Sequence, residues 1–289
     1  MPPSEHTALE DSVLVRIAPG LKQYADRLWG VDADVPVSYP LEAHAPIAAI
    51  EESSFWFRHR NNIIQTVVRN HPPSGPIVDV GGGNGSVALA LKRCGLSTIV
   101  VEPGNIGAGI AHARGLTVIR SAFGAEMFVQ GAVPAIGLFD VIEHIPDPQH
   151  LLVECRTVLC DGGMIYITVP ALQWLWSSDD QFAGHYRRYN QPLLRQTLVE
   201  AGFEVVLLSA FFSLLVPPLA LLRTLPSVLG LRTLQGPDDA LKHHRVNHRF
   251  AAMMGRALAF ETALLARRTT LPFGTSLIAV ARKPATPHA

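Results

Sequence analysis

The sequence contains no long apolar run and no surplus of charge of either sign. Its longest largely apolar run, residues 210–222, is 13 residues long and includes Pro217 and Pro218. A helix that crosses a bilayer needs roughly 20 apolar residues, so this run cannot span a membrane. It would suit a pocket for an acyl chain or a membrane interface. Lysine plus arginine and aspartate plus glutamate each number 24, so the overall charge gives no reason to expect a nucleic-acid partner.

The sequence also lacks paired cysteines and signs of export. Cys94, Cys155 and Cys160 lie in apolar helical contexts without CxxC spacing, which predicts core thiols in a reducing compartment and no disulfide or zinc site. Residues 1–16 carry three acidic side chains and no apolar core of a signal peptide, so we expect no signal peptide and a cytoplasmic location. Hydrophobic residues make up 48% of the 289 residues, enough for a domain with a sizeable core.

A glycine-rich turn follows a short apolar segment. Residues 76–80 have the pattern of a buried parallel strand, residues 81–85 (Gly-Gly-Gly-Asn-Gly) that of a tight turn, and residues 86–91 that of a helix start. Glycines allow the sharp turn and leave no Cβ to block a ligand lying over it. Because the first N–H groups of a helix are unpaired, they can bind polar or anionic ligand atoms. The stretch predicts the first βα unit of a doubly wound sheet.

The spacing of the glycines separates the kinds of nucleotide site. No lysine follows Gly85, which excludes a phosphate-binding P-loop, and the dinucleotide fingerprint would need glycine or alanine where Ser86 stands. The pattern is Asp-x-Gly-x-Gly-x-Gly, formed by Asp79, Gly81, Gly83 and Gly85. Glu102 ends the next predicted strand, 17 residues after Gly85. A carboxylate there can accept both ribose hydroxyls of a nucleoside, although an ordinary strand-end acid would look the same.

This motif and the acid that follows it resemble the first motif of class I S-adenosylmethionine-dependent methyltransferases. The resemblance implies an α/β fold: a doubly wound, Rossmann-like sheet of seven strands whose last strand is antiparallel. The alternation of strand and helix patterns between residues 75 and 202 fits it. Strands are expected at 76–80, 97–102, 116–120, 134–140, 163–169, 202–209 and 274–281. The implied cofactor is S-adenosyl-L-methionine, held by Asp79, Gly81, Gly83, Gly85, Glu102, Ala122, Phe123 and Asp140. The family often has an acid at the adenine, where this chain has serine and alanine.

Two segments flank the expected sheet. The leading helices of the resembled family close over the cofactor and acceptor, so the resemblance implies an N-terminal helical lid at residues 1–70 and a methyltransferase domain at residues 71–289. The adjacent aromatics Phe55, Trp56 and Phe57 cannot all face one core, because neighbours on a helix point about 100° apart. They meet a ligand or another segment, or they pack on two sides of a buried helix. Residues 211–273 are predicted to form a helical cap insert. Its apolar character fits a hydrophobic acceptor, a peripheral membrane contact or a homodimer.

A second motif follows the fourth predicted strand. Asp140, Glu143 and His144 stand at i, i+3 and i+4, so a helical turn would place them on one face, where they could form half of a site for magnesium, manganese or zinc. With Gly184-His185 downstream, this DxxEH motif resembles ubiquinone-pathway O-methyltransferases and the methyltransferases of small-RNA 3′ ends. The resemblance implies Asp140, Glu143, His144 and His185 as metal ligands. Alternatively the acid and histidine brace the chain without a metal, and His185 or His144 is the general base.

Residues 174–189 form the densest polar and aromatic cluster of the chain. Loops beyond the carboxyl end of a strand commonly carry function. We therefore expect the acceptor to contact Trp56, Tyr186, Arg187 and Arg188, with the arginines recognising a carboxylate or phosphate. The two arginines could equally pair with Asp179, Asp180 or Glu52.

Together these features predict an S-adenosylmethionine-dependent methyltransferase for a small, hydrophobic or lipid-linked acceptor. O-methylation is favoured, with His185 removing the proton, assisted or not by a metal, and with His144 and Glu143 beside it. N- or C-methylation and RNA 2′-O-methylation are alternatives, and the neutral charge disfavours RNA. A cofactor-binding module without catalysis is an alternative from a different functional class. A nicotinamide oxidoreductase is disfavoured by the glycine spacing.

Overall fold

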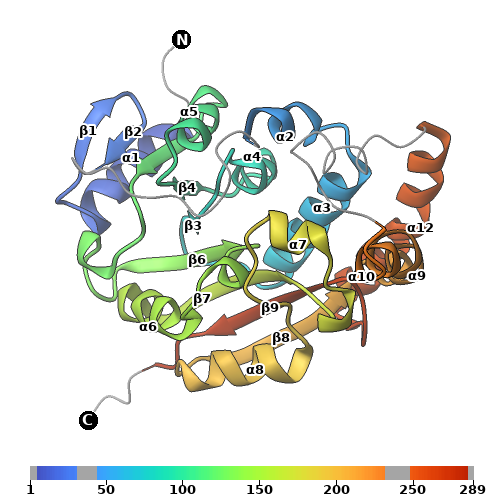
Figure 1. Cartoon of the computed structure of the whole chain (residues 1–289). Coiled ribbons are helices and arrows are strands. Elements are labelled where there is room, and N and C mark those ends of the chain that lie inside the picture. The colour runs from blue at the N-terminus through green and yellow to red at the C-terminus, as the bar shows by residue number, and fades with distance from the viewer. Residues whose placement is uncertain (1–4, 31–43, 232–247, 286–289) are drawn as a thin grey trace.

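The computed structural model describes residues 5–30, 44–231 and 248–285. Within these residues the strands form a single sheet in the order β1-β2-β5-β4-β3-β6-β7-β9-β8, with helices on both faces (Figure 1). The strands are β1 (Lys22–Ala25), β2 (Leu28–Gly30), β3 (Ile77–Val80), β4 (Thr98–Val101), β5 (Thr117–Arg120), β6 (Val133–Phe139), β7 (Leu159–Pro170), β8 (Glu204–Phe211) and β9 (Ser276–Arg282). Strands β2 to β7 pair in parallel, whereas β9 is antiparallel to both β7 and β8.

The predicted doubly wound sheet with an antiparallel last strand is confirmed, but the predicted strand count is wrong. Strands β3 to β9 correspond to the seven expected ones, and β7 begins earlier than expected, at Leu159. The described residues hold nine strands, because residues 22–30 add the hairpin β1–β2 at one edge. Gly30 allows β2 to approach β5 closely, since a Cβ on it would lie 2.7 Å from the carbonyl oxygen of Arg120.

The helices connect and cover these strands. They are α1 (Glu5–Ile17), α2 (His44–Ile50), α3 (Phe55–Asn70), α4 (Ser86–Arg93), α5 (Asn105–Ala113), α6 (Pro148–Val158), α7 (Ser178–Phe182), α8 (Gln191–Glu200), α9 (Val216–Leu219), α10 (Leu225–Val228) and α12 (His248–Ala266). Residues of α1, α6 and α8 pack in one core cluster against the sheet, and residues of α3, α4 and α12 pack in another. In β3, Val78 and Val80 belong to the first cluster and Ile77 to the second, as expected for a strand buried on both faces.

The first helix is part of the packed domain. The buried carboxylate of Glu10 accepts hydrogen bonds from Lys92 Nζ at 3.0 Å and from Thr117 Oγ1 at 3.1 Å, and Leu14 and Ile17 are fully buried. The prediction of a helical lid at residues 1–70 is therefore wrong for residues 22–30, which form the hairpin of β1 and β2, and residues 31–43 lie outside the described residues. A lid function remains a prediction, now for α2 and α3.

The described part of the insert before β9 contains the helices α9, α10 and α12. Helices α9 and α10 are joined by a π-helical turn at Ala220–Thr224, which precedes Pro226, a residue without the N–H that a regular α-helix would need there. Residues 232–247 of the insert lie outside the described residues. No helix among the described residues is long and apolar enough to cross a bilayer. The three cysteines are free thiols, and Cys155 is buried in the core.

Candidate functional site

The glycine loop lies at the carboxyl ends of β3 and β4. Gly81, Gly83 and Gly85 have φ angles of +68°, +53° and +73°, which L side chains rarely adopt. A Cβ on Gly85 would lie 2.4 Å from Leu116 Cδ1, whereas a Cβ on Gly83 would meet no atom within 4 Å. The loop is thus packed at its helix end and open at Gly83, where a ligand can approach the backbone.

Glu102 holds this loop in place. The carboxylate is buried, and its two oxygens accept hydrogen bonds from the backbone N–H of Gly83 at 2.9 Å and of Gly104 at 2.7 Å. A carboxylate oxygen can accept more than one hydrogen bond, so the same side chain can still receive ribose hydroxyls. The ribose role remains a prediction, and the bracing of Gly83 is an additional role.

Asp79 lies beneath the loop rather than facing outward. Its side chain is buried, and neither oxygen has a hydrogen-bond partner among the described residues. A Cβ added to Gly82 would lie 3.0 Å from one of these oxygens. Burial raises the pKa of Asp79 to about 7, Arg60 opposes this shift and Glu102 adds to it. The carboxyl group can therefore hold a proton near neutral pH.

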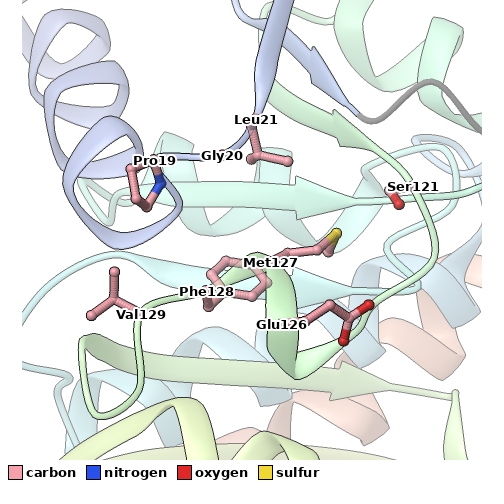
Figure 2. Close-up of a pocket in the computed structure, with 8 residues that line it drawn as sticks. All are labelled: Pro19, Gly20, Leu21, Ser121, Glu126, Met127, Phe128 and Val129. Carbon is pink, nitrogen blue, oxygen red and sulfur yellow. The ribbon is translucent and has the colours of Figure 1, made fainter.

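The loop after β5 contributes to a pocket between the end of α1 and the segment that joins β5 to β6. Ser121 is buried and Ala122 and Phe123 are half-buried, and the ring of Phe123 packs on Phe128 with centroids 5.6 Å apart. The pocket has a volume of about 350 Å³ (Figure 2) and is lined by Pro19, Gly20, Leu21, Ser121, Glu126, Met127, Phe128 and Val129. Of the loop residues predicted for the adenine, Ser121 lines this pocket and Ala122 and Phe123 do not.

Asp140 directly follows β6 and does not join the other predicted metal ligands. Its φ angle is +58°, a conformation that aspartate tolerates better than most residues. Its carboxylate accepts hydrogen bonds from Arg60 Nη1 at 2.7 Å and Thr168 Oγ1 at 3.0 Å. The guanidinium of Arg60 also lies 5.2 Å from the ring centroid of Trp56. Arg60, which sequence reasoning missed, thus ties α3 to this edge of the sheet.

Glu143, His144 and His185 come together. Each offers a ligand atom, and these atoms lie within 4.8 Å of one another. Glu143 is buried and neither of its oxygens has a hydrogen-bond partner among the described residues; burial, and then the charge of Asp140, raise its pKa well above the ordinary value. Burial and the neighbouring His185 lower the pKa of His144 to about 4, so this imidazole is neutral at pH 7. Three of the four predicted metal ligands are gathered.

The loop at residues 174–189 brings His185 to this group. The backbone N–H of Tyr186 donates to the carbonyl of Glu143 at 2.8 Å. His185 Nδ1 lies 2.9 Å from Asp180 Oδ1, and the guanidinium of Arg188 donates to the same oxygen at 2.7 Å. These hydrogen bonds and the charge of Arg188 hold the pKa of Asp180 below its ordinary value despite burial.

This contact sets the tautomer of His185. An ionised Asp180 only accepts, so the proton is on Nδ1 and the lone pair is on Nε2. The role of Asp180 was missed in the sequence, although the capping box of Ser177 and Asp180 at the start of α7 is a readable pattern.

The structure corrects the predicted substrate role of Arg188. This side chain is buried and binds Asp180 and the carbonyl of Ala171, so pairing with Asp180 is the alternative that the structure shows. Arg187 donates to the carbonyl of Pro146 at 2.7 Å. Tyr186 remains 59% exposed and Trp56 stacks on Phe212 with centroids 5.5 Å apart. Contact of Tyr186, Arg187 and Trp56 with an acceptor remains a prediction.

Comparisons with known proteins identify the family. A methyltransferase-domain model matches residues 55–208, just over half of the chain. A Mycolicibacterium smegmatis protein named "Probable S-adenosylmethionine-dependent methyltransferase" is 27% identical over 180 residues, which are 60% of this chain and 69% of that protein. A ubiquinone biosynthesis O-methyltransferase of Burkholderia pseudomallei is 24% identical over 156 residues, 47% of this chain and 67% of that enzyme. Matches to other mycobacterial methyltransferases cover 46% of their length, so the chain spans about half of those relatives.

A solved structure shares the fold. It is a methyltransferase in complex with a Haloferax volcanii methyltransferase activator, with a TM-score of 0.52 and 17% identity over 85% of this chain and 96% of that one. S-adenosylmethionine is the cofactor of the matched family. The glycine spacing, the antiparallel last strand and the domain match agree: the chain belongs to the family of proteins with an S-adenosylmethionine-dependent methyltransferase domain.

Proposed function

We propose that the chain transfers the methyl group of S-adenosylmethionine to a hydroxyl oxygen of a small, apolar or lipid-linked acceptor. The observation that carries this proposal is the placement of two features at one edge of the sheet. The glycine loop is open at Gly83 and braced by Glu102, and the cluster of Glu143, His144 and His185 follows β6 and β7 at the same carboxyl edge. Ligands of such sheets bind beyond this edge.

The reaction needs alignment and a base. The acceptor oxygen attacks the methyl carbon as the bond from that carbon to the sulfonium sulfur breaks, and S-adenosylhomocysteine leaves as a neutral thioether. His185 Nε2 takes the proton of the hydroxyl, because Nδ1–H is directed to Asp180. His144, neutral at pH 7, supplies a second imidazole without adding charge. Orientation of two reactants can supply about 7–11 kcal/mol of barrier lowering.

The cluster also fits a divalent metal. Glu143 has two buried oxygens without partners, and Asp180 fixes His185 so that its other nitrogen faces the cluster. A carboxylate with two imidazoles is a donor set suited to zinc or manganese. Glu143, His144 and His185 would hold the ion, and Nε2 of His185 would then bind the ion instead of acting as the base, while Asp140 stays bound to Arg60. A bound ion would lower the pKa of the acceptor hydroxyl.

Three finer parts of the proposal come from the sequence. The apolar insert at residues 211–273 supports an apolar acceptor and a cap over it. The position of Trp56 between Arg60 and Phe212 supports a closing role for α3. The three free thiols support a cytoplasmic location.

The experiment is transfer of a labelled methyl group from S-adenosylmethionine to a panel of apolar phenols and alcohols, with amines and short RNA as competing acceptors. We expect transfer to hydroxyls. His185→Ala should lower turnover at least about 100-fold and leave the affinity for S-adenosylmethionine nearly unchanged. Equal loss of both in this variant would contradict the role of His185. Activity unchanged by EDTA, with no ion in the purified protein, would exclude a role for a metal in the reaction.

A further inference from the structure

Part of the insert presents an apolar surface to solvent. We define the insert surface as Leu221, Leu222, Leu225, Val228, Leu229 and Leu231, which are 49% to 78% exposed. The first four follow helical spacing and share one face of the helical run 216–228, and Leu229 is the C-cap of that run. Scattered exposed leucines are ordinary, but a contiguous apolar face marks a contact site. This run is at the right-hand side of the molecule in Figure 1.

The opposite face of the same helical run holds the loop of the candidate site. Arg223 is the single charged residue of the sequence between 210 and 231, and its guanidinium lies 3.6 Å from the carboxylate of Asp179 and 3.8 Å from that of Asp180. Thr224 Oγ1 donates to the carbonyl of Leu175 at 3.1 Å. Ser227 Oγ accepts from the backbone N–H of Ser178 at 2.9 Å. The segment that carries His185 and Asp180 is therefore held by the back of the exposed helix.

The charge of the insert indicates what the insert surface contacts. The sequence at residues 211–273 holds eight lysines and arginines and three acids, a net charge of +5, whereas the whole chain is neutral. One of the three acids, Glu261, is buried and bound to His59. An apolar helix face in a basic segment is the pattern of helices that lie on anionic membranes. A second copy of the chain would bring like charges together, which disfavours self-association.

We propose that the insert surface docks on an anionic phospholipid bilayer and that docking stabilises the loop at residues 174–189 through Arg223, Thr224 and Ser227. A run of 13 residues extends about 20 Å as a helix, too short to cross the apolar layer, so it lies in the headgroup region. The regulatory part rests on the proposed function, because it concerns the loop that carries His185. The docking itself does not depend on that function.

The first experiment measures vesicle binding of the full chain. Leu222→Glu/Val228→Glu changes two exposed side chains of the insert surface, and Val199→Glu on α8, 55% exposed, is the matched control. We expect the wild type and Val199→Glu to bind vesicles of phosphatidylcholine with phosphatidylglycerol at least about tenfold more tightly than the double variant, and binding to weaken in high salt. Thermal unfolding of the three proteins checks that all are folded.

Two results would overturn the docking proposal. One is equal binding, or no binding, by all three proteins. The other is a wild-type dimer in light scattering that the double variant abolishes, which would make a second copy the occupant of the insert surface.

The second experiment measures hydrogen exchange of the amides at residues 174–189 with and without the same vesicles. We expect vesicles to slow exchange there in the wild type. Arg223→Gln should bind vesicles as the wild type does but lose this protection. Unchanged exchange in the wild type, or equal protection in the variant, would refute the coupling. Neither readout requires methyl transfer, so a protein that docks but transfers no methyl group would contradict the proposed function alone.

Discussion

The glycine loop at residues 81–85 and the loop at residues 174–189 lie at the same edge of the sheet, yet different contacts hold them. The glycine loop is a backbone structure, set by three positive φ angles and by N–H groups bound to Glu102. The second loop depends on buried side-chain charges, with Asp180 bound to His185 and Arg188. A cofactor site built from backbone geometry tolerates changes of side chain, whereas a site built from side-chain contacts can differ between proteins that bind different acceptors. The two regions should therefore fail in different ways when they are altered.

The largest expected effect concerns the acid beneath the glycine loop. Because the pKa of Asp79 is raised from 3.8 to about 7, the folded protein keeps a proton that the unfolded chain loses. For this group, stability is highest below about pH 4 and falls by up to about 4 kcal/mol as the pH rises through 7. Asp79→Asn should remove this part of the pH dependence of the unfolding free energy, measured by urea denaturation from pH 5 to 8. Asp161→Asn, with an exposed carboxylate, is the control; parallel curves for all three proteins would refute the shift.

The next effect compares a packed position and an open position of the glycine loop, Gly85 and Gly83. Gly85→Ala adds a methyl group 2.4 Å from Leu116 Cδ1 at a φ of +73°, which should lower the unfolding free energy by about 3 kcal/mol. Gly83→Ala has a positive φ but open space, so it should cost only about 1 kcal/mol. Urea denaturation compares the two, and equal losses would show that the loop is not packed as described.

A smaller effect tests the side-chain network of the second loop. Asp180→Asn should lower methyl transfer by about 10- to 100-fold, because the tautomer and orientation of His185 are no longer fixed. It should also change the pH profile of turnover, which a purely structural defect would not. Asp179→Asn, which removes a carboxylate that lies 3.6 Å from Arg223 but leaves the contact of Asp180 with His185, should leave turnover within about twofold of the wild type. Equal activity in both variants would contradict the positioning role.

The same contrast explains what could be predicted from the sequence. The glycine loop and the positions of β3 to β9 were predictable, because backbone requirements leave a glycine or apolar pattern in adjacent residues. The antiparallel direction of β9 was implied only by the family resemblance. The gathering of Glu143, His144 and His185 was also predictable from the motif.

The partner of Asp140 was not predictable. Asp140 binds Arg60 on α3, 80 residues away, because burial of charge is decided by tertiary packing. For Arg188 the sequence left Asp179, Asp180 and Glu52 open as partners, and packing selects Asp180. The hairpin at residues 22–30 was missed because its strands are too short to show periodicity.

Calorimetric titration with S-adenosylmethionine and with NAD tests whether the cofactor binds over Gly83 beside Glu102. We expect S-adenosylmethionine to bind at least about 100-fold more tightly than NAD. Gly83→Ala, which remains folded, should lose at least about tenfold in affinity for S-adenosylmethionine. No heat with S-adenosylmethionine, or an affinity unchanged in Gly83→Ala, would contradict this placement of the cofactor.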